Sequence, residues 1–165
     1  MNNRQKEYGL AFLIISIIGL LFVMLSGSVF SGYHFMDCHD YTECKQDLAY
    51  MSWFETFINH VEREFGTRFR PTWHLNTIFE TYLWGDNMLL QGLWQIFQII
   101  IAAFLIYLLG RNIKWTHRES LLFVGLSLVG TQSAIFCQTL AIETTGLVIL
   151  LLSWFFVLNY INGGG

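Results

Sequence analysis

The chain has 165 residues, of which 54% are hydrophobic and only 13% are charged. Soluble domains carry about 25% charged residues, so this composition excludes an ordinary soluble protein. The charges are gathered in a few places and leave long uncharged runs between them. We therefore expect an integral membrane protein, with one membrane domain over residues 1–162.

Four long apolar segments predict four transmembrane helices, at residues 9–30, 88–109, 121–141 and 145–161. At about 1.5 Å per residue, the first three are long enough to cross about 30 Å of hydrocarbon. The fourth is at the lower limit for a span, and a re-entrant or interfacial segment is the alternative there. The first follows Arg4 and Lys6 as a signal peptide would, but its length favours a retained signal-anchor.

The distribution of basic residues predicts that both termini are cytoplasmic. Arg111, Lys114 and Arg118 lie in the short connection at 111–120, whereas the long connection at 31–87 holds four basic and nine acidic residues. Short loops rich in Lys and Arg stay on the cytoplasmic side of a membrane. We expect a multi-pass protein of the bacterial inner membrane, whose three basic residues contact a cytoplasmic protein partner or anionic lipid.

The outside segment at 31–87 is too long and too aromatic for a simple linker. Apolar residues at helical spacing predict an amphipathic helix at 47–65, and Pro71 and Gly85 delimit a second one at 72–84. We expect the two helices to lie in the membrane interface or to cap the bundle. Arg63, Arg68 and Arg70 around the intervening turn either bind lipid phosphates or an acidic partner, or pair locally with glutamates.

Two cysteines and two histidines lie close together at the start of the outside segment. Cys38 and Cys44 are six residues apart, and in an oxidising periplasm we expect them to form a structural disulfide. Metal binding by His34, Cys38, His39 and Cys44 is the rival interpretation, although their spacing matches no zinc pattern. Thiol redox chemistry is less favoured because the chain has no C-x-x-C motif.

Glutamines form a stripe in the segment at 88–109, since Gln91, Gln95 and Gln98 recur at spacings of four and three residues. An unpartnered amide in hydrocarbon costs about 2–7 kcal/mol, so we expect the stripe to meet other helices, another copy of the chain or water. Gln132 and Gln138 of the third span lie at matching depth and are its expected partners. A channel lined by the stripe and Gln138, and a bound small ligand, are the alternatives.

No Asp, Glu, Lys, Arg or His lies in the middle of any predicted span. Proton relays, ion-coupled carriers and voltage sensors normally need such a residue there. No catalytic triad or phosphate-binding loop is present in the sequence either. We therefore expect neither an enzyme nor a cofactor. The final three glycines are typical of a linker added to a recombinant chain and are expected to carry no function.

The order of the spans and the single large outside loop resemble small four-span bacterial inner-membrane proteins. These include immunity proteins against pore-forming toxins, exclusion proteins and the membrane subunit of phage-defence systems such as Kiwa. The resemblance implies a non-catalytic module that senses an envelope event or blocks an invader. Together with the residue patterns, it leads us to expect an all-α four-helix bundle with a helical outer cap. We expect this bundle to form a homo-oligomer, to contact membrane lipids and a cytoplasmic partner, and not to bind nucleic acid directly.

Overall fold

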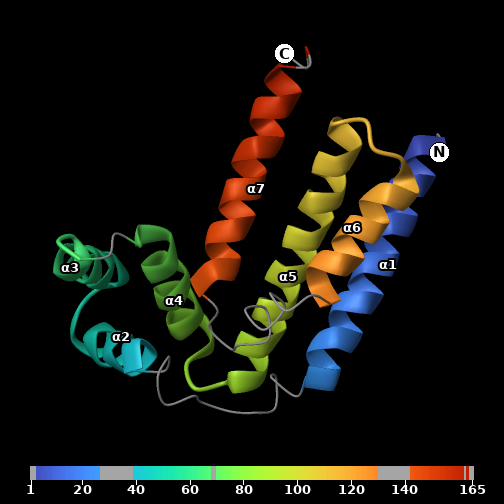
Figure 1. The fold of residues 1–165 in the computed structure, drawn as a ribbon. Coiled ribbons are helices and arrows are strands. Elements are labelled where there is room, and N and C mark those ends of the chain that lie inside the picture. Colours follow the sequence, from blue (N-terminus) through green and yellow to red (C-terminus); the bar gives the residue numbers. More distant parts are fainter. Residues whose placement is uncertain (1–2, 27–38, 68–69, 130–141, 162, 164–165) are drawn as a thin grey trace.

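The computed structural model describes residues 3–26, 39–67, 70–129, 142–161 and 163, and all regular structure in them is helical. This confirms the expected all-α class. The helices are α1 (Asn3–Ser26), α2 (His39–Tyr50), α3 (Trp53–Glu64), α4 (Pro71–Trp84), α5 (Met88–Asn112), α6 (His117–Val129) and α7 (Ile142–Ile161). Helices α1, α5, α6 and α7 form a bundle, and α2, α3 and α4 lie together at one side of it (Figure 1). We call the second group the cap.

Helix α5 is the centre of the bundle, because it packs against α1, α6 and α7. One apolar cluster joins Ile99, Ala103 and Tyr107 of α5 to Ile15 of α1 and Val124 of α6. A second cluster joins α5 to α7 through Ala102, Leu105 and Leu151. Small residues at these contacts let the helix backbones approach closely. The glutamine stripe lies in the N-terminal half of α5, where two of its members bond to α7.

Two of the described helices are long and apolar enough to cross a membrane, at Leu89–Asn112 and Thr144–Ile161. They correspond to the predicted second and fourth spans. Helix α1 begins before the predicted first span and covers it up to Ser26, and α6 covers the predicted third span up to Val129. The rest of these two segments lies outside the described residues. The first residue of α1 and the last residue of α7 lie at the same end of the bundle (Figure 1).

The single helix predicted at 47–65 was wrong, because the chain forms two helices there. Helix α2 ends at Tyr50, and Ser52 begins α3 with a reciprocal cap: the Ser52 hydroxyl accepts from the Glu55 amide, and the Glu55 carboxylate accepts from the Ser52 amide. These two contacts satisfy N–H groups that have no partner inside a helix. The S-x-x-E pattern that produces them is visible in the sequence.

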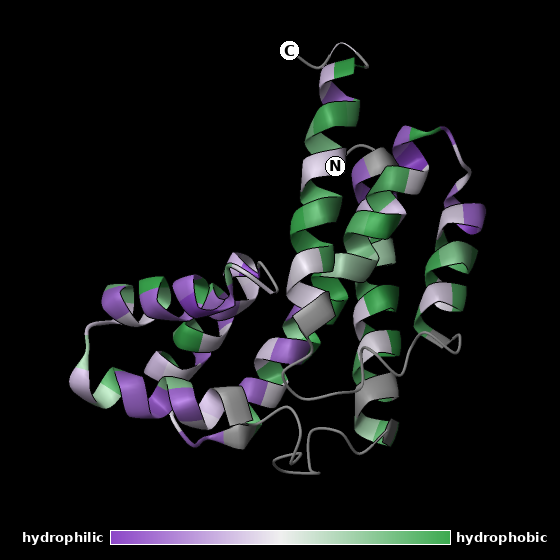
Figure 2. Cartoon of the chain, turned by 60° about the vertical axis from the view of Figure 1, so that its left-hand side comes forward, coloured by the Kyte–Doolittle hydropathy of each residue, from purple (hydrophilic) through white to green (hydrophobic). Residues whose placement is uncertain are grey.

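Hydrophilic residues are concentrated in the cap, and hydrophobic residues dominate the bundle (Figure 2). Helix α4 covers the predicted helix at 72–84, with Pro71 as its first residue. The predicted loop at 111–120 is much shorter than expected, because α5 continues to Asn112 and α6 begins at His117. Thr116 and Glu119 form the same reciprocal cap at the start of α6. Lys114 lies in the tight connection, where its φ is +69°.

Gly110 allows α5 and α6 to turn closely past each other. A Cβ atom at Gly110 would lie 2.8 Å from Ser120 Oγ and 3.1 Å from Trp115 Cε3. We predict that Gly110→Leu lowers the free energy of unfolding by about 1–3 kcal/mol, which is the usual cost of overpacking. The measurement is SDS-driven unfolding in mixed micelles. Gly9→Leu is the control, because a Cβ there meets nothing within 4 Å. An equal effect of the two substitutions would contradict the predicted close contact.

Candidate functional site

Asn76 of α4 connects the cap to the bundle. Its Oδ1 accepts one hydrogen bond from Trp94 Nε1 at 2.9 Å and another from Gln98 Nε2 at 2.8 Å. Its Nδ2 donates to the carboxylate of Glu80, one turn further along α4. The carbonyl oxygen of this one amide therefore holds α4 against α5, while its NH₂ group bonds within α4. The sequence reasoning missed Asn76, although an amide within a helix rich in apolar residues was the available signal.

The three glutamines of the stripe are buried, with 2–6% of their surface exposed. Gln95 Nε2 donates to Thr144 Oγ1 at 2.9 Å, and Thr145 Oγ1 donates to Gln98 Oε1 at 2.9 Å. These two bonds join α5 to the first turn of α7. We call the set of Asn76, Gln95, Gln98, Thr144 and Thr145 the amide seam. Gln132 and Gln138 were the expected partners, so the role of these two threonines was not foreseen.

Gln91 binds the end of α4 instead. Its Nε2 donates to the carbonyl of Gly85 at 2.8 Å, and the hydroxyl of Tyr41 in α2 donates to the same carbonyl. Gly85 terminates α4 with a φ of +51°, a conformation that glycine adopts most readily. Gln91 Oε1 is buried and has no partner among the described residues. The expected partners Gln132 and Gln138 lie outside the described residues.

Glu80 is a carboxyl group buried at the cap side of the seam, with 2% of its surface exposed. Burial raises the pKa of Glu80 to about 7, and the hydrogen bond from Asn76 opposes that rise. Removing a carboxylate from water disfavours its charged form unless a cation compensates. A group with a pKa near neutral therefore lies beside the residue that ties the cap to the bundle.

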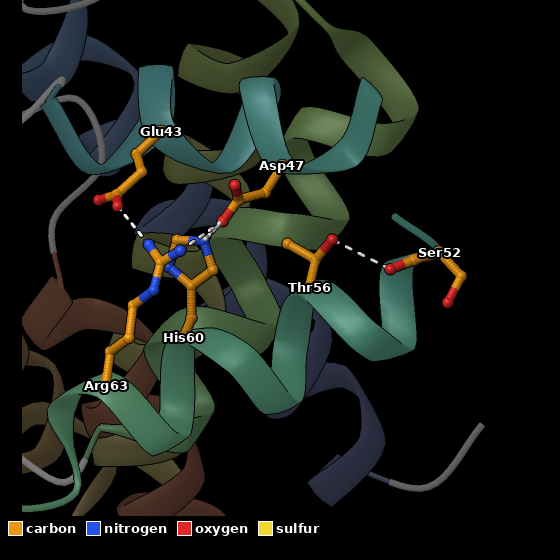
Figure 3. Close-up of polar contacts among 6 residues, drawn as sticks. All are labelled: Glu43, Asp47, Ser52, Thr56, His60 and Arg63. Carbon is orange, nitrogen blue, oxygen red and sulfur yellow. Dashed lines mark hydrogen bonds and ion pairs between the residues drawn. The ribbon is translucent and has the colours of Figure 1, made fainter. Parts of the chain in front are cut away.

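The cap is held together by ion pairs on its inner side. Asp47 of α2 contacts His60 Nε2 at 3.1 Å and Arg63 at 3.7 Å, and Arg63 also pairs with Glu43 (Figure 3). All these groups point into the space between α2 and α3 (Figure 3). Thr56 and His60 of α3 therefore pack inward, whereas Phe54 is 56% exposed.

A second ionic cluster joins Glu64 of α3 to α4. The Glu64 carboxylate accepts from His74 Nε2 at 3.0 Å and from Arg70 Nε at 3.1 Å. The guanidinium of Arg70 also lies 4.2 Å from the ring centre of Trp73. The bond from Arg70 lowers the pKa of Glu64, and burial lowers the pKa of His74. His60 and His74 lie next to each other, with ring centres 5.4 Å apart.

Two of the three arginines predicted for the basic turn thus form ion pairs within the cap. Arg63 pairs with Glu43 and Asp47, and Arg70 pairs with Glu64. Arg68 lies outside the described residues. On the opposite end of the bundle, Arg111 contacts Glu7 at 3.3 Å and donates to the Trp115 carbonyl, while Lys114 and Arg118 are exposed.

Cys44 is buried in the cap, with 1% of its surface exposed, and it forms no disulfide with any described residue. Burial raises the pKa of the Cys44 thiol to about 11, which makes it a poor nucleophile at neutral pH. Cys38 and His34 lie outside the described residues, so the Cys38–Cys44 disulfide stays a prediction. No group of three or more His, Cys, Asp or Glu is arranged for metal binding within the part of the chain that is described.

Comparison with protein-family models, with curated protein sequences and with solved structures finds no match to this chain. The assignment of a function therefore depends on the geometry of the amide seam and the cap. Most buried polar groups there are bonded to each other, an arrangement that fixes helices in position.

We predict that Asn76→Ala lowers the free energy of unfolding by about 1–3 kcal/mol, since it leaves the buried donors of Trp94 and Gln98 unpaired. Unfolding of the detergent-solubilised protein by SDS measures this change. Asn59→Ala in α3 is the matched control, because its side chain makes no hydrogen bond among the described residues. Equal stability of the Asn76 variant and the wild type would show that the seam does not hold the cap.

The raised pKa of Glu80 predicts a pH-dependent stability. In the folded protein Glu80 keeps its proton up to about pH 7, whereas in the unfolded chain it releases the proton near pH 4.5. The stabilisation is fully present below pH 4.5, and it is lost as the pH rises through about 7. The unfolding midpoint of Glu80→Gln should therefore equal that of the wild type near pH 4.5 and be higher than that of the wild type at pH 8. In the control Glu55→Gln, the difference from wild type should stay constant from pH 6 to 8, because the pKa of the exposed Glu55 is lowered.

Proposed function

We propose that this protein is a non-catalytic module of the bacterial inner membrane that receives a signal or a partner at its outer cap. In this proposal α1, α5, α6 and α7 all span the membrane, and both termini are cytoplasmic. The shared end of the two termini and the apolar exteriors of α5 and α7 support this placement. Defence against phage or immunity to a toxin is the kind of role that suits such a module.

The amide seam is the observation that carries the proposal. Asn76 of the cap is bonded to Gln98 of α5, which is bonded in turn to Thr145 of α7. Burial raises the pKa of the neighbouring Glu80 to about 7. This connected set of side chains can transmit a change in the cap to the bundle. Arg63 and His60 lie in one ionic cluster of the cap, and Arg70 and His74 lie in an adjacent one. A ligand that competes for the acids of these clusters would alter the packing of the cap.

On the cytoplasmic side, the proposal assigns Arg111, Lys114 and Arg118 to a protein partner or to anionic lipid. The exposure of Lys114 and Arg118 supports this assignment. The large exposed apolar surface of the bundle, which includes Phe156 and Leu126 at 67% and 72% exposure, favours lipid contact and a homo-oligomer.

A channel lined by the glutamine stripe is the weaker candidate. Gln95 and Gln98 are bonded to α4 and α7, and these contacts leave their amides little capacity to bind water or ions. Purified protein in proteoliposomes separates the two functions. A non-conducting module should release no entrapped ions or small fluorophores, whereas flux abolished by Gln95→Leu would establish the channel and refute the module.

The sensing role is tested by extraction in mild detergent after chemical crosslinking in cells. We predict an oligomer with a cytoplasmic partner, and loss of that partner when Arg111, Lys114 and Arg118 are all changed to Gln. Arg63→Gln on the opposite side is the control and should retain the partner. A monomer that carries no partner under these conditions would contradict the proposal.

A further inference from the structure

A pocket of about 550 Å³ lies where the cap meets the bundle. Its walls come from α3, α4, α5 and α7, and they include Trp53, Leu75, Phe79, Leu83, Trp94 and Ile149. Helices α4 and α7 lie on the side of α5 away from α1 and α6 (Figure 1). We call this cavity the α4–α7 pocket. Nothing in the proposed sensing function uses it.

The chemistry of the walls indicates an apolar occupant. The lining residues include no charged side chain. Two of the polar ones are already bonded, since Asn76 accepts from Gln98 and Trp94, and Thr145 donates to Gln98. Water is held in a protein cavity only where several polar groups are available to bind it. A hydrocarbon ligand therefore fills this pocket more favourably than water does.

The pocket is continuous with surfaces that are apolar and exposed. Leu75 and Phe79 on α4 and Ile149 on α7 line it and are 42–48% exposed, so the pocket is open to the outside of the molecule. Beside it, α3 lies across the direction of α5 and α7 in both views and exposes Phe54 and Ile58 (Figures 1 and 2). A helix with an outward apolar face and aromatic residues is typical of the membrane interface.

We propose that the α4–α7 pocket binds one acyl chain of a phospholipid from the outer leaflet. The inference rests on the membrane placement proposed above and does not depend on the sensing role. The size of the pocket suits a single small ligand, whereas a helix of a second copy is about 10–12 Å across with its side chains. A chain in this position contacts Trp53 of the cap and Trp94 of the bundle at once, and it fills the space beside the amide seam.

Native mass spectrometry of the full chain, purified in mild detergent, tests the proposal. The wild type should retain one phospholipid per chain. Leu75→Trp combined with Leu83→Trp fills the pocket from half-exposed positions and should reduce the lipid-bound fraction about tenfold. The matched control changes Leu89 and Leu93 of α5 to Trp, two positions of similar exposure that do not line the pocket, and should retain the lipid.

A second measurement does not depend on the folding of the filled variant. Phospholipid brominated in its acyl chains is bound, and bulk lipid is then exchanged for detergent. Residual quenching of tryptophan fluorescence should fall strongly when Trp53 and Trp94 are both changed to Phe, and remain in Trp115→Phe. No retained lipid in the wild type, equal retention in both double variants, quenching that persists without Trp53 and Trp94, or a dimer formed through this face would each overturn the inference. If the inference fails but the protein still inserts into membranes and releases no ions from proteoliposomes, the proposed function stands.

Discussion

A buried side-chain amide needs a hydrogen-bonding partner, and this constraint shapes the whole arrangement around α5. Gln95 and Gln98 are satisfied by Asn76 of the cap and by the two threonines that open α7. Each bond is worth little by itself, about 0.6–1.7 kcal/mol in lipid. Their effect is mainly positional, because the alternative is a buried donor without a partner. The stripe therefore decides where α4 and α7 meet α5.

The cap follows from the same rule applied to charge. Asp47, Glu64 and their histidine and arginine partners turn the polar sides of α2, α3 and α4 toward each other. Two apolar side chains of α3, Phe54 and Ile58, are left exposed. The paired charges therefore account for the way α2, α3 and α4 pack on one another.

The sequence alone predicted a large part of this fold. The all-α class, the helix at 72–84 and the central apolar helix follow from apolar periodicity and from Pro71 and Gly85, which are local signals. The break between α2 and α3 was missed because the apolar spacing continues through it, although Ser52 and Glu55 encode a capping box. The capping box outweighed the apolar spacing and started a new helix at this point.

The candidate site was harder to foresee. Gln95 and Gln98 stood out as polar residues in an apolar helix, but Thr144 and Thr145 are 49 and 47 residues away from them along the chain. Such pairings depend on how helices pack, and periodicity carries no information about them. The buried position of Glu80 was equally invisible, because its pKa is raised by burial in the packed cap and not by its sequence neighbours.

The central claim is that the cap is fixed to the bundle by the bond between Asn76 and Gln98. A double-mutant cycle on the free energy of unfolding, with Asn76→Ala, Gln98→Ala and the double variant in the same micelles, measures it most directly. The structure predicts a coupling energy of about 0.5–1.7 kcal/mol between the two residues. Strictly additive effects of the two substitutions would contradict it.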